Sequence, residues 1–216
     1  VPYAGGAMVI AVVAIVHVFI AQFAVGAGIL NAFMETRALK RGDTGVLDFL
    51  RLNSRVIILL PFIGGAVTGV GIWFAISLVS PETTGLLIHL FLWAWAAEWV
   101  LFLVEIVSGY LYYYTWDKLD SRSHCLVGWI YAAAAGLSLV VINGILCFMV
   151  SGQGLDAAAE PMKFSFWQGL FNTTYWPSLI LRMTACLSLG ALGAMTLANL
   201  SKTLSEEVKG RVIREA

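Results

Sequence analysis

Long apolar segments alternate with short polar ones along the whole chain. Five of these segments have about twenty or more residues, the length needed to cross a bilayer as a helix. Backbone groups in lipid must be hydrogen-bonded within their own segment, so each segment is expected to be α-helical. The pattern predicts an all-α integral membrane protein whose residues 1–200 form one domain of five transmembrane helices, roughly Ala7–Met34, Val56–Val79, Gly85–Tyr114, Val127–Val150 and Tyr175–Leu200.

Two prolines and a polar tail add detail to this pattern. Pro61 lies inside the second span and Pro177 near the start of the fifth, where a kink is expected because proline has no amide hydrogen. Residues 201–216 are expected to form a cytoplasmic helical tail, with Ser205 as its N-cap and acidic residues in its first turn. The many charges of the tail predict a solvated helix that is partly frayed.

Basic residues are concentrated in alternate connections between the spans. The connection after the first span, the connection after the third span and the tail together hold eleven of the 13 Lys and Arg residues. The connections after the second and fourth spans together contain a single basic residue, Lys163. By the positive-inside rule the chain should have its N-terminus outside and its C-terminus in the cytoplasm.

Composition and charge narrow the class of protein further. Hydrophobic residues make up 60% of the chain and charged residues 12%, against an apolar share of about half in soluble domains. The 13 basic and 13 acidic residues balance, so no nucleic-acid partner is indicated. The three cysteines lack the spacing of a metal or disulfide motif and are expected to be buried thiols. The chain enters its first span almost at once, and no cleavable signal peptide is expected.

The third span carries titratable residues at membrane depth. Glu98 and Glu105 are seven residues apart, which returns to nearly the same helix face about 10 Å further along the axis. A charged group at the bilayer centre costs at least about 2.5 kcal/mol, so both carboxylates need a partner, a proton or water. His89 precedes Glu98 by nine residues and falls on about the opposite face of a continuous helix. The span therefore predicts a polar site inside the bundle.

Two further residues could contribute to this site. His17 lies about 15 Å into the first span, a depth similar to that of Glu98, and a neutral imidazole there could ligate haem iron or bond across helices. Glu98 could serve the same iron, a neighbouring iron or a proton route. Arg182, inside the fifth span, could snorkel to the interface or pair with a haem propionate or a glutamate. His124 lies in a basic connection and is not expected to be a ligand.

Several short motifs carry a family resemblance. The chain reads HVFIAQFAVGAGILNAFMET from His17, GGAVTG at Gly64–Gly69, and Trp116-Asp117-Lys118-Leu119 before His124. In this order, and with the two glutamates of the third span, they resemble subunit I of the cytochrome bd quinol oxidases over about residues 10–140. The resemblance implies that His17 ligates a high-spin haem and that Glu98 and Glu105 serve as haem-pocket and proton-path residues. It also implies a prokaryotic cytoplasmic membrane.

The chain also departs from that family's pattern. Arg182 stands where the fifth helix of the family carries the ligand of the low-spin haem, and a buried glutamate of the second helix is replaced within Gly71–Phe74. The two third-span glutamates are one residue closer than usual. With five spans, the chain lacks the quinol-binding loop and the later helices of the family, so we expect a partner subunit.

These observations predict a haem-binding subunit of a respiratory electron-transfer complex. Haem b is the expected cofactor, and haem d is possible although the sequence does not support it. The expected partners are other membrane subunits and lipid, with a cytochrome c on the outer side and a quinone as candidates. Two alternatives stay open: one half of a split, oxygen-reducing bd-type oxidase, and a haem-free membrane anchor or assembly subunit. The proposed site comprises His17 and Glu98 as iron ligands, Glu105, His89 as an alternative ligand, and Arg182 as propionate partner.

Overall fold

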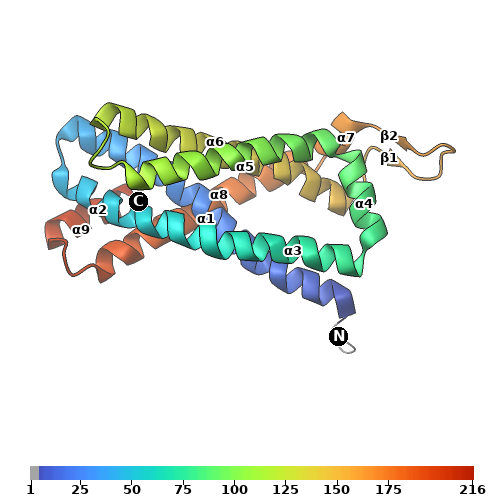
Figure 1. The fold of residues 1–216 in the computed structure, drawn as a ribbon, viewed down its shortest axis with the longest axis horizontal. Coiled ribbons are helices and arrows are strands. Elements are labelled where there is room, and N and C mark those ends of the chain that lie inside the picture. Colours follow the sequence, from blue (N-terminus) through green and yellow to red (C-terminus); the bar gives the residue numbers. More distant parts are fainter. Residues whose placement is uncertain (1–4) are drawn as a thin grey trace.

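The computed structural model describes residues 5–216, which form an elongated bundle of helices (Figure 1). Within these residues, five helical stretches are long and apolar enough to cross a membrane, as predicted. In chain order they are α1 (Gly5–Arg41), α2 (Thr44–Leu59) continued by η1 (Leu60–Gly65) and α3 (Ala66–Val79), α5 (Leu92–Tyr114), α6 (Ser121–Ser151) and α8 (Tyr175–Leu200). A short helix, α4 (Pro81–Leu90), links α3 to α5, and α9 (Glu206–Glu215) follows α8.

Helix α1 is the element against which most of the others pack. It contacts α8, α6, α2 and α3, while α5 and α6 form a second tightly packed antiparallel pair. At one end of the bundle α1 meets the start of α2 and helix α9, and we call it the basic end because Arg37, Arg41 and Arg211 lie there. The opposite end holds α4 and a β-hairpin, and we call it the hairpin end (Figure 1).

Glycines bring α1 and α8 into backbone contact. A Cβ atom at Gly26 would lie 1.7 Å from the Cys186 carbonyl oxygen, and one at Gly190 would lie 2.5 Å from the Ala27 amide nitrogen. Small residues allow this approach, which is a common way to pair helices where no hydrophobic effect drives their association. Cys186 is fully buried at this contact, as expected for an apolar thiol.

The connection predicted between the first two spans is almost entirely helical. Only Gly42 and Asp43 separate α1 from α2, with Gly42 at a φ of 67° and the Asp43 side chain accepting a hydrogen bond from the Val46 amide. The helices extend past the apolar segments, because hydropathy indicates only the part of a helix that lies in lipid. Beyond that part, α2 is amphipathic and buries Phe49 and Leu50. Likewise, α6 begins at Ser121, capped by Asp120.

Asp120, the N-cap of α6, lies outside the spans, and its carboxyl group has a lowered pKa. Hydrogen bonds from the Ser123 side chain and from its backbone N–H lower the pKa of the Asp120 carboxyl below its usual range. Such a carboxylate favours the start of a helix because it meets unpaired amide groups and the positive end of the helix dipole.

The third predicted span is broken, which corrects the continuous helix expected over Gly85–Tyr114. The break is at Phe91, between α4 and α5, and α4 runs across the hairpin end instead of along the bundle (Figure 1). Phe91 is completely buried and meets Phe148 and Phe164 edge-on, with ring centroids 4.9 and 5.3 Å apart. Burying this ring fixes the change of direction, so the helical phase between His89 and Glu98 that we expected is lost.

Pro61 changes the helix type within the second span. Residues Leu60–Gly65 form a π-helical turn, with Pro61 near its start. Proline cannot donate an α-helical hydrogen bond, and a wider turn is a common way to accommodate such an interruption. Pro177 lies in the first turn of α8, where helix amides lack partners in any case, and the helix continues.

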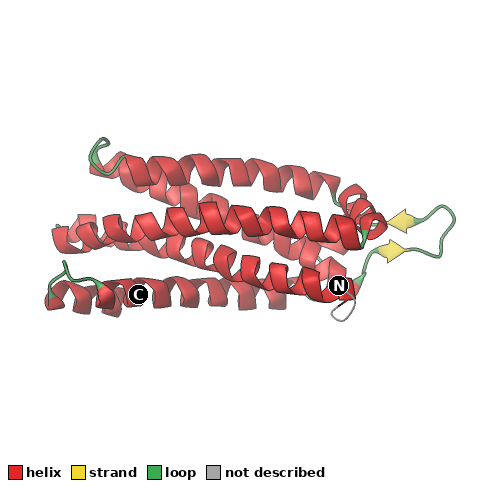
Figure 2. Cartoon of the chain, turned by 60° about the horizontal axis from the view of Figure 1, so that its bottom comes forward, coloured by secondary structure: helices red, strands yellow, loops and turns green. Residues whose placement is uncertain are grey.

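A hairpin that the sequence pattern does not predict lies in the connection before α8. Strands β1 (Leu155–Asp156) and β2 (Lys163–Phe164) pair antiparallel, and helix α7 (Phe166–Leu170) follows. Figure 2 shows the hairpin projecting beyond the helices. Strands of two residues are too short to give an alternating pattern, although Phe164 anchors the hairpin in the aromatic cluster around Phe91.

The tail forms the predicted helix, but it is not solvated as we expected. Helix α9 begins after Ser205, whose hydroxyl accepts from the Val208 amide. Val208 and Val212 are buried against α1, α2 and α8. Arg211 forms an ion pair with Asp43, and Glu215 pairs with Arg41. The two valines, four residues apart, give the tail an apolar face that its many charges obscured.

The contact between α1 and α8 gives a stability prediction. Replacing Gly26 with alanine places a methyl group against the Cys186 backbone, so we expect the free energy of unfolding to fall by about 1–3 kcal/mol or more. The measurement is denaturation of the detergent-extracted protein. Gly136→Ala in α6 is the matched control, because nothing lies within 4 Å of a Cβ there. Equal stability of the two variants would contradict the close approach.

Candidate functional site

His17 lies in α1 and faces α3 in the half of the bundle nearer the hairpin end. The imidazole is half-buried, and its Nδ1 lies 3.1 Å from the hydroxyl oxygen of Thr68. A Cβ at Gly69 would lie 3.1 Å from the ring's Cε1, so this glycine leaves room beside the ring. No hydrogen bond to Nε2 is present within residues 5–216.

Glu98 lies in α5 and is bonded on one side only. The Ser138 hydroxyl of α6 donates to Oε1 at 2.6 Å, while Oε2 is buried and has no partner among the described residues. The indole nitrogen of Trp95, one turn earlier, is likewise buried without an acceptor there. Unsatisfied buried polar atoms are rare in native proteins and often mark a water, ion or ligand position.

The contact between two tryptophans relates His17 to Glu98. Trp73 of α3 meets Trp95 of α5 with ring centroids 5.1 Å apart. Thr68, the partner of His17, precedes Trp73 by five residues and so lies roughly 7.5 Å nearer the basic end. Glu98 follows Trp95 by three residues and lies roughly 4.5 Å nearer the same end. His17 and Glu98 therefore lie at similar depth on separate helices, and no hydrogen bond between described residues joins them.

Glu105 belongs to a series of polar positions shared by α5 and α6. In α5, Glu98 and Glu105 are followed after seven more residues by Tyr112. In α6, which runs antiparallel to α5, the same spacing separates Ser138, Tyr131 and His124. Ser138 bonds Glu98, and His124 bonds the Tyr112 backbone, while the Tyr131 hydroxyl between them is buried without a partner among the described residues. Because α5 is continuous over Leu92–Tyr114, residues seven apart such as Glu98 and Glu105 lie on nearly the same face, as expected.

His89 and Arg182 lie apart from these groups. His89 is exposed on α4, beyond the break at Phe91. Arg182 is half-buried in α8, where its Nε donates to the Ser178 hydroxyl at 3.2 Å, and no carboxylate pairs with it in the described part of the chain. The glutamate pairing considered for Arg182 is therefore not seen here. Residues 5–216 hold no group of three or more His, Cys, Asp or Glu side chains placed to bind a metal.

A buried ionisable cluster near the basic end was missed from the sequence. It consists of Glu35, Tyr112 and His124, which are 1–2% exposed, and we call it the Glu35 cluster. Tyr112 donates to Glu35 Oε2 at 2.9 Å, and His124 Nδ1 lies 2.7 Å from Oε1. His124 Nε2 faces the Tyr112 carbonyl at 2.9 Å and must carry a hydrogen, because a carbonyl only accepts. One proton thus lies between Nδ1 and the carboxylate.

The placement of His124 corrects the expectation that it lies in a loop. Because α6 begins at Ser121, His124 is in the first turn of a helix and its ring stacks on Tyr112, with centroids 4.7 Å apart. Trp116 lies 4.2 Å from the same ring and donates to the Ser54 hydroxyl. The available signal was the seven-residue series in α5 and α6, which ends on His124 and Tyr112.

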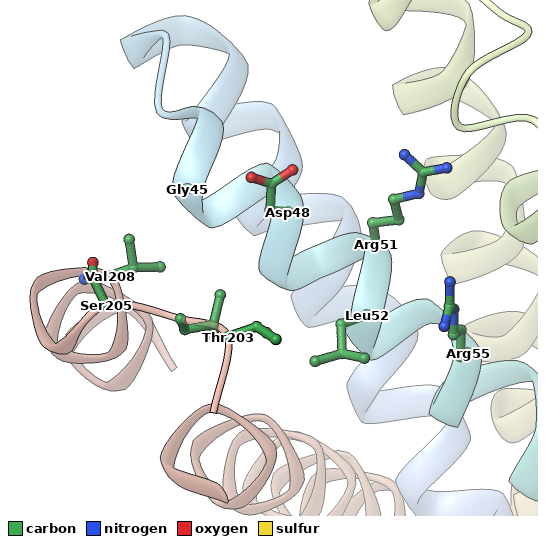
Figure 3. Close-up of a pocket in the computed structure, with 9 residues that line it drawn as sticks. Gly45, Asp48, Arg51, Leu52, Arg55, Thr203, Ser205 and Val208 are labelled. Atoms are coloured by element: carbon green, nitrogen blue, oxygen red, sulfur yellow. Dashed lines mark hydrogen bonds between the residues drawn. The ribbon is translucent and has the colours of Figure 1, made fainter. Parts of the chain in front are cut away.

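A separate cavity of about 520 Å³ opens at the basic end. Asp48, Arg51 and Arg55 follow one another along α2 on one side of it, and the segment 203–205 lies opposite (Figure 3). The Arg51 guanidinium pairs with Asp117, which neutralises it. This cavity holds none of the residues predicted for the functional site.

Comparison with known proteins identifies the family and the fold of the chain. The sequence model of cytochrome bd terminal oxidase subunit I matches residues 7–212. The chain belongs to the cytochrome bd terminal oxidase subunit I family. The solved bd oxidase from Geobacillus thermodenitrificans has a similar fold, with a TM-score of 0.76 and 21% sequence identity. The match covers 96% of this chain and 49% of the other, so this chain spans about half of its length. A search of curated proteins found no significant match.

Haem is the cofactor characteristic of cytochrome bd oxidases, and the residues around His17 and Glu98 fit such a group. Within the described residues, His17 has one nitrogen bonded to Thr68 and one without a hydrogen bond, and Gly69 leaves space beside the ring. Glu98 offers a buried carboxylate oxygen that has no partner in the same part of the chain, at a similar depth. A single imidazole with a nearby polar group is a typical haem environment, and it needs no cluster of three ligands.

The Glu35 cluster gives a second stability prediction. Removing one member of a buried ion pair leaves the other uncompensated, so Glu35→Ala and His124→Ala should each lower the free energy of unfolding by about 3–5 kcal/mol. The double variant should lose less than the sum, because it leaves neither group unpaired. Denaturation of the four proteins in detergent measures the cycle. Glu82→Ala, at an exposed position in α4, serves as control, and strictly additive losses would argue against the pair.

Proposed function

We propose that this chain is a haem-b-binding subunit of a membrane electron-transfer complex, with His17 as the axial ligand of the iron. The observation that carries the proposal is the state of the His17 ring. Its Nδ1 is held by Thr68, its Nε2 makes no hydrogen bond within the described chain, and Gly69 provides room beside it. An imidazole held in this way is the common form of a protein ligand to iron.

The other polar groups have roles that follow from their positions. Glu98, with one oxygen bonded to Ser138 and one unbonded, is proposed as second ligand or as acid of the haem pocket. Glu105 lies one heptad nearer the basic end and is proposed to carry protons or to stabilise the bundle. The guanidinium end of Arg182 has no partner among residues 5–216 and is proposed to pair with a propionate, while His89 is the alternative ligand if His17 is not the ligand.

The cofactor would supply one-electron transfer through its iron. The protein's own contribution is to orient the His17 imidazole, to keep Glu98 within hydrogen-bonding distance of Ser138, and to surround both with apolar side chains. Low polarity strengthens every electrostatic interaction in such a pocket. A carboxylate there can hold a proton when the charge of the pocket changes, which is the chemistry that couples electron and proton movement.

The setting of the complex follows from the charge distribution and the family. The excess of Lys and Arg in the predicted cytoplasmic segments supports an N-terminus outside the cell and a C-terminus in the cytoplasm. The membrane is proposed to be the cytoplasmic membrane of a prokaryote. We propose that residues 1–200, of which 1–4 lie outside the described residues, form the membrane domain and that α9 packs onto its cytoplasmic end. Other membrane subunits are the expected partners, and a quinone or a cytochrome c on the outer side are the candidate electron carriers.

The test is the loss of haem from a single variant. The complex, purified from membranes through a tag on this chain, should give a b-type signal in the reduced-minus-oxidised spectrum and in the pyridine haemochrome assay. His17→Ala should remove the signal of the haem bound here while the complex still assembles. His89→Ala is the matched control and should leave the spectrum unchanged, because His89 is exposed on α4.

Two other outcomes would favour the alternatives. A well-assembled wild-type complex without haem on this chain would indicate a membrane anchor or assembly subunit. A complex that reduces oxygen would favour the split-oxidase alternative, in which another polypeptide supplies the rest of a bd-type site.

A further inference from the structure

We propose that Thr68 is a positioning residue that fixes the tautomer of His17, holding the ring hydrogen on Nδ1 and leaving a lone pair on Nε2. This inference rests on the proposed function in so far as Nε2 is to bind iron. The tautomer itself is a property of the protein alone, because the atoms that decide it all belong to α1, η1 and α3.

The assignment follows from counting hydrogens around one hydroxyl. The Thr68 oxygen lies 2.7 Å from the Gly64 carbonyl oxygen and 3.2 Å from that of Gly65. Carbonyls only accept, and a hydroxyl has a single hydrogen, so that hydrogen is directed to the backbone. The lone pairs of the same oxygen are then what His17 Nδ1 meets at 3.1 Å. The ring nitrogen must be the donor, and a neutral imidazole with hydrogen on Nδ1 has none on Nε2.

The local sequence explains why the hydroxyl is held in this way. Gly64 and Gly65 are the last residues of the π-helical turn that contains Pro61. Thr68 lies four residues after Gly64 and three after Gly65. A helical threonine readily bonds the carbonyls at these two positions, which fixes its χ1 angle. A Cβ at Gly64 would lie 3.3 Å from Ile20 of α1, so a glycine here also lets the two helices approach. Turn, glycines and threonine together place one acceptor against His17.

This arrangement has a chemical consequence for ligation. A ligand histidine is usually oriented by a partner on its other nitrogen, and removing that partner typically weakens the metal site by about 10- to 100-fold. Thr68 is such a partner, and a weak one, because a neutral hydroxyl raises ligand basicity less than a carboxylate does. We therefore expect His17 to bind as a neutral imidazole with little imidazolate character.

The first test measures the tautomer without any cofactor. The full chain has three histidines, so ¹⁵N NMR of histidine-labelled, haem-free protein in detergent or lipid is readily assigned with His17→Gln and His89→Gln. We expect a protonated Nδ1 and an unprotonated Nε2 for His17. Thr68→Val removes the hydroxyl at nearly constant shape and should lose this preference, whereas Thr68→Ser should keep it. A wild-type His17 protonated on Nε2, or a valine variant with an unchanged tautomer, would overturn the assignment.

The second test uses the haem-loaded complex. Thr68→Val should weaken haem binding by about 10- to 100-fold and shift the iron–histidine stretching band in the resonance Raman spectrum of the reduced state, with Thr68→Ser close to wild type. An unchanged band in the valine variant would count against Thr68 as the positioning residue. If His17→Ala keeps its haem, the proposed ligand is wrong, and the NMR result still decides the tautomer.

Discussion

The structure depends on how the polar groups of α1 are paired inside an apolar bundle. At the basic end, the Glu35 carboxylate receives the Tyr112 hydroxyl of α5 and faces His124 of α6, so three helices meet at one charge. In the middle, Gly26 brings α1 against the backbone of α8. Nearer the hairpin end, His17 meets Thr68 of α3. Each contact joins α1 to a different neighbour, and together they fix its rotation and depth.

The three contacts differ in what they contribute. A buried ion pair gains little over apolar packing in total stability, but it strongly disfavours any arrangement that separates its members. The Glu35 cluster therefore specifies how α1, α5 and α6 align more than it strengthens the bundle. The glycine contact contributes close packing, which drives helix association in lipid. The His17 contact joins one ring nitrogen to one hydroxyl and leaves Nε2 without a hydrogen bond within residues 5–216.

Much of this arrangement could be predicted from the sequence, and the rest could not for physical reasons. Hydropathy located the five spans because lipid imposes a simple length and composition on them. The same measure missed the helical continuation through Arg37 and Arg41, since charged residues outside lipid are equally helical. Hydropathy also missed the break between α4 and α5, because the residue at the break, Phe91, is as apolar as the helices on either side of it. The shared face of Glu98 and Glu105 followed from their spacing, whereas His124 was misplaced because its neighbours Arg122 and Ser123 suggest a loop.

The π-helical turn at Pro61 has a consequence for the whole second span. A π turn holds about one residue more than an α turn, so the helix after Gly65 is out of phase with the helix before Leu60 by one residue, about 100°. Before this slip Ile58 faces Gly109 of α5, as does Phe62 within the turn, and after it Thr68 and Gly69 face α1. One continuous segment thereby serves two neighbours in succession. A helical wheel drawn over residues 44–79 as a single α-helix would merge the two faces.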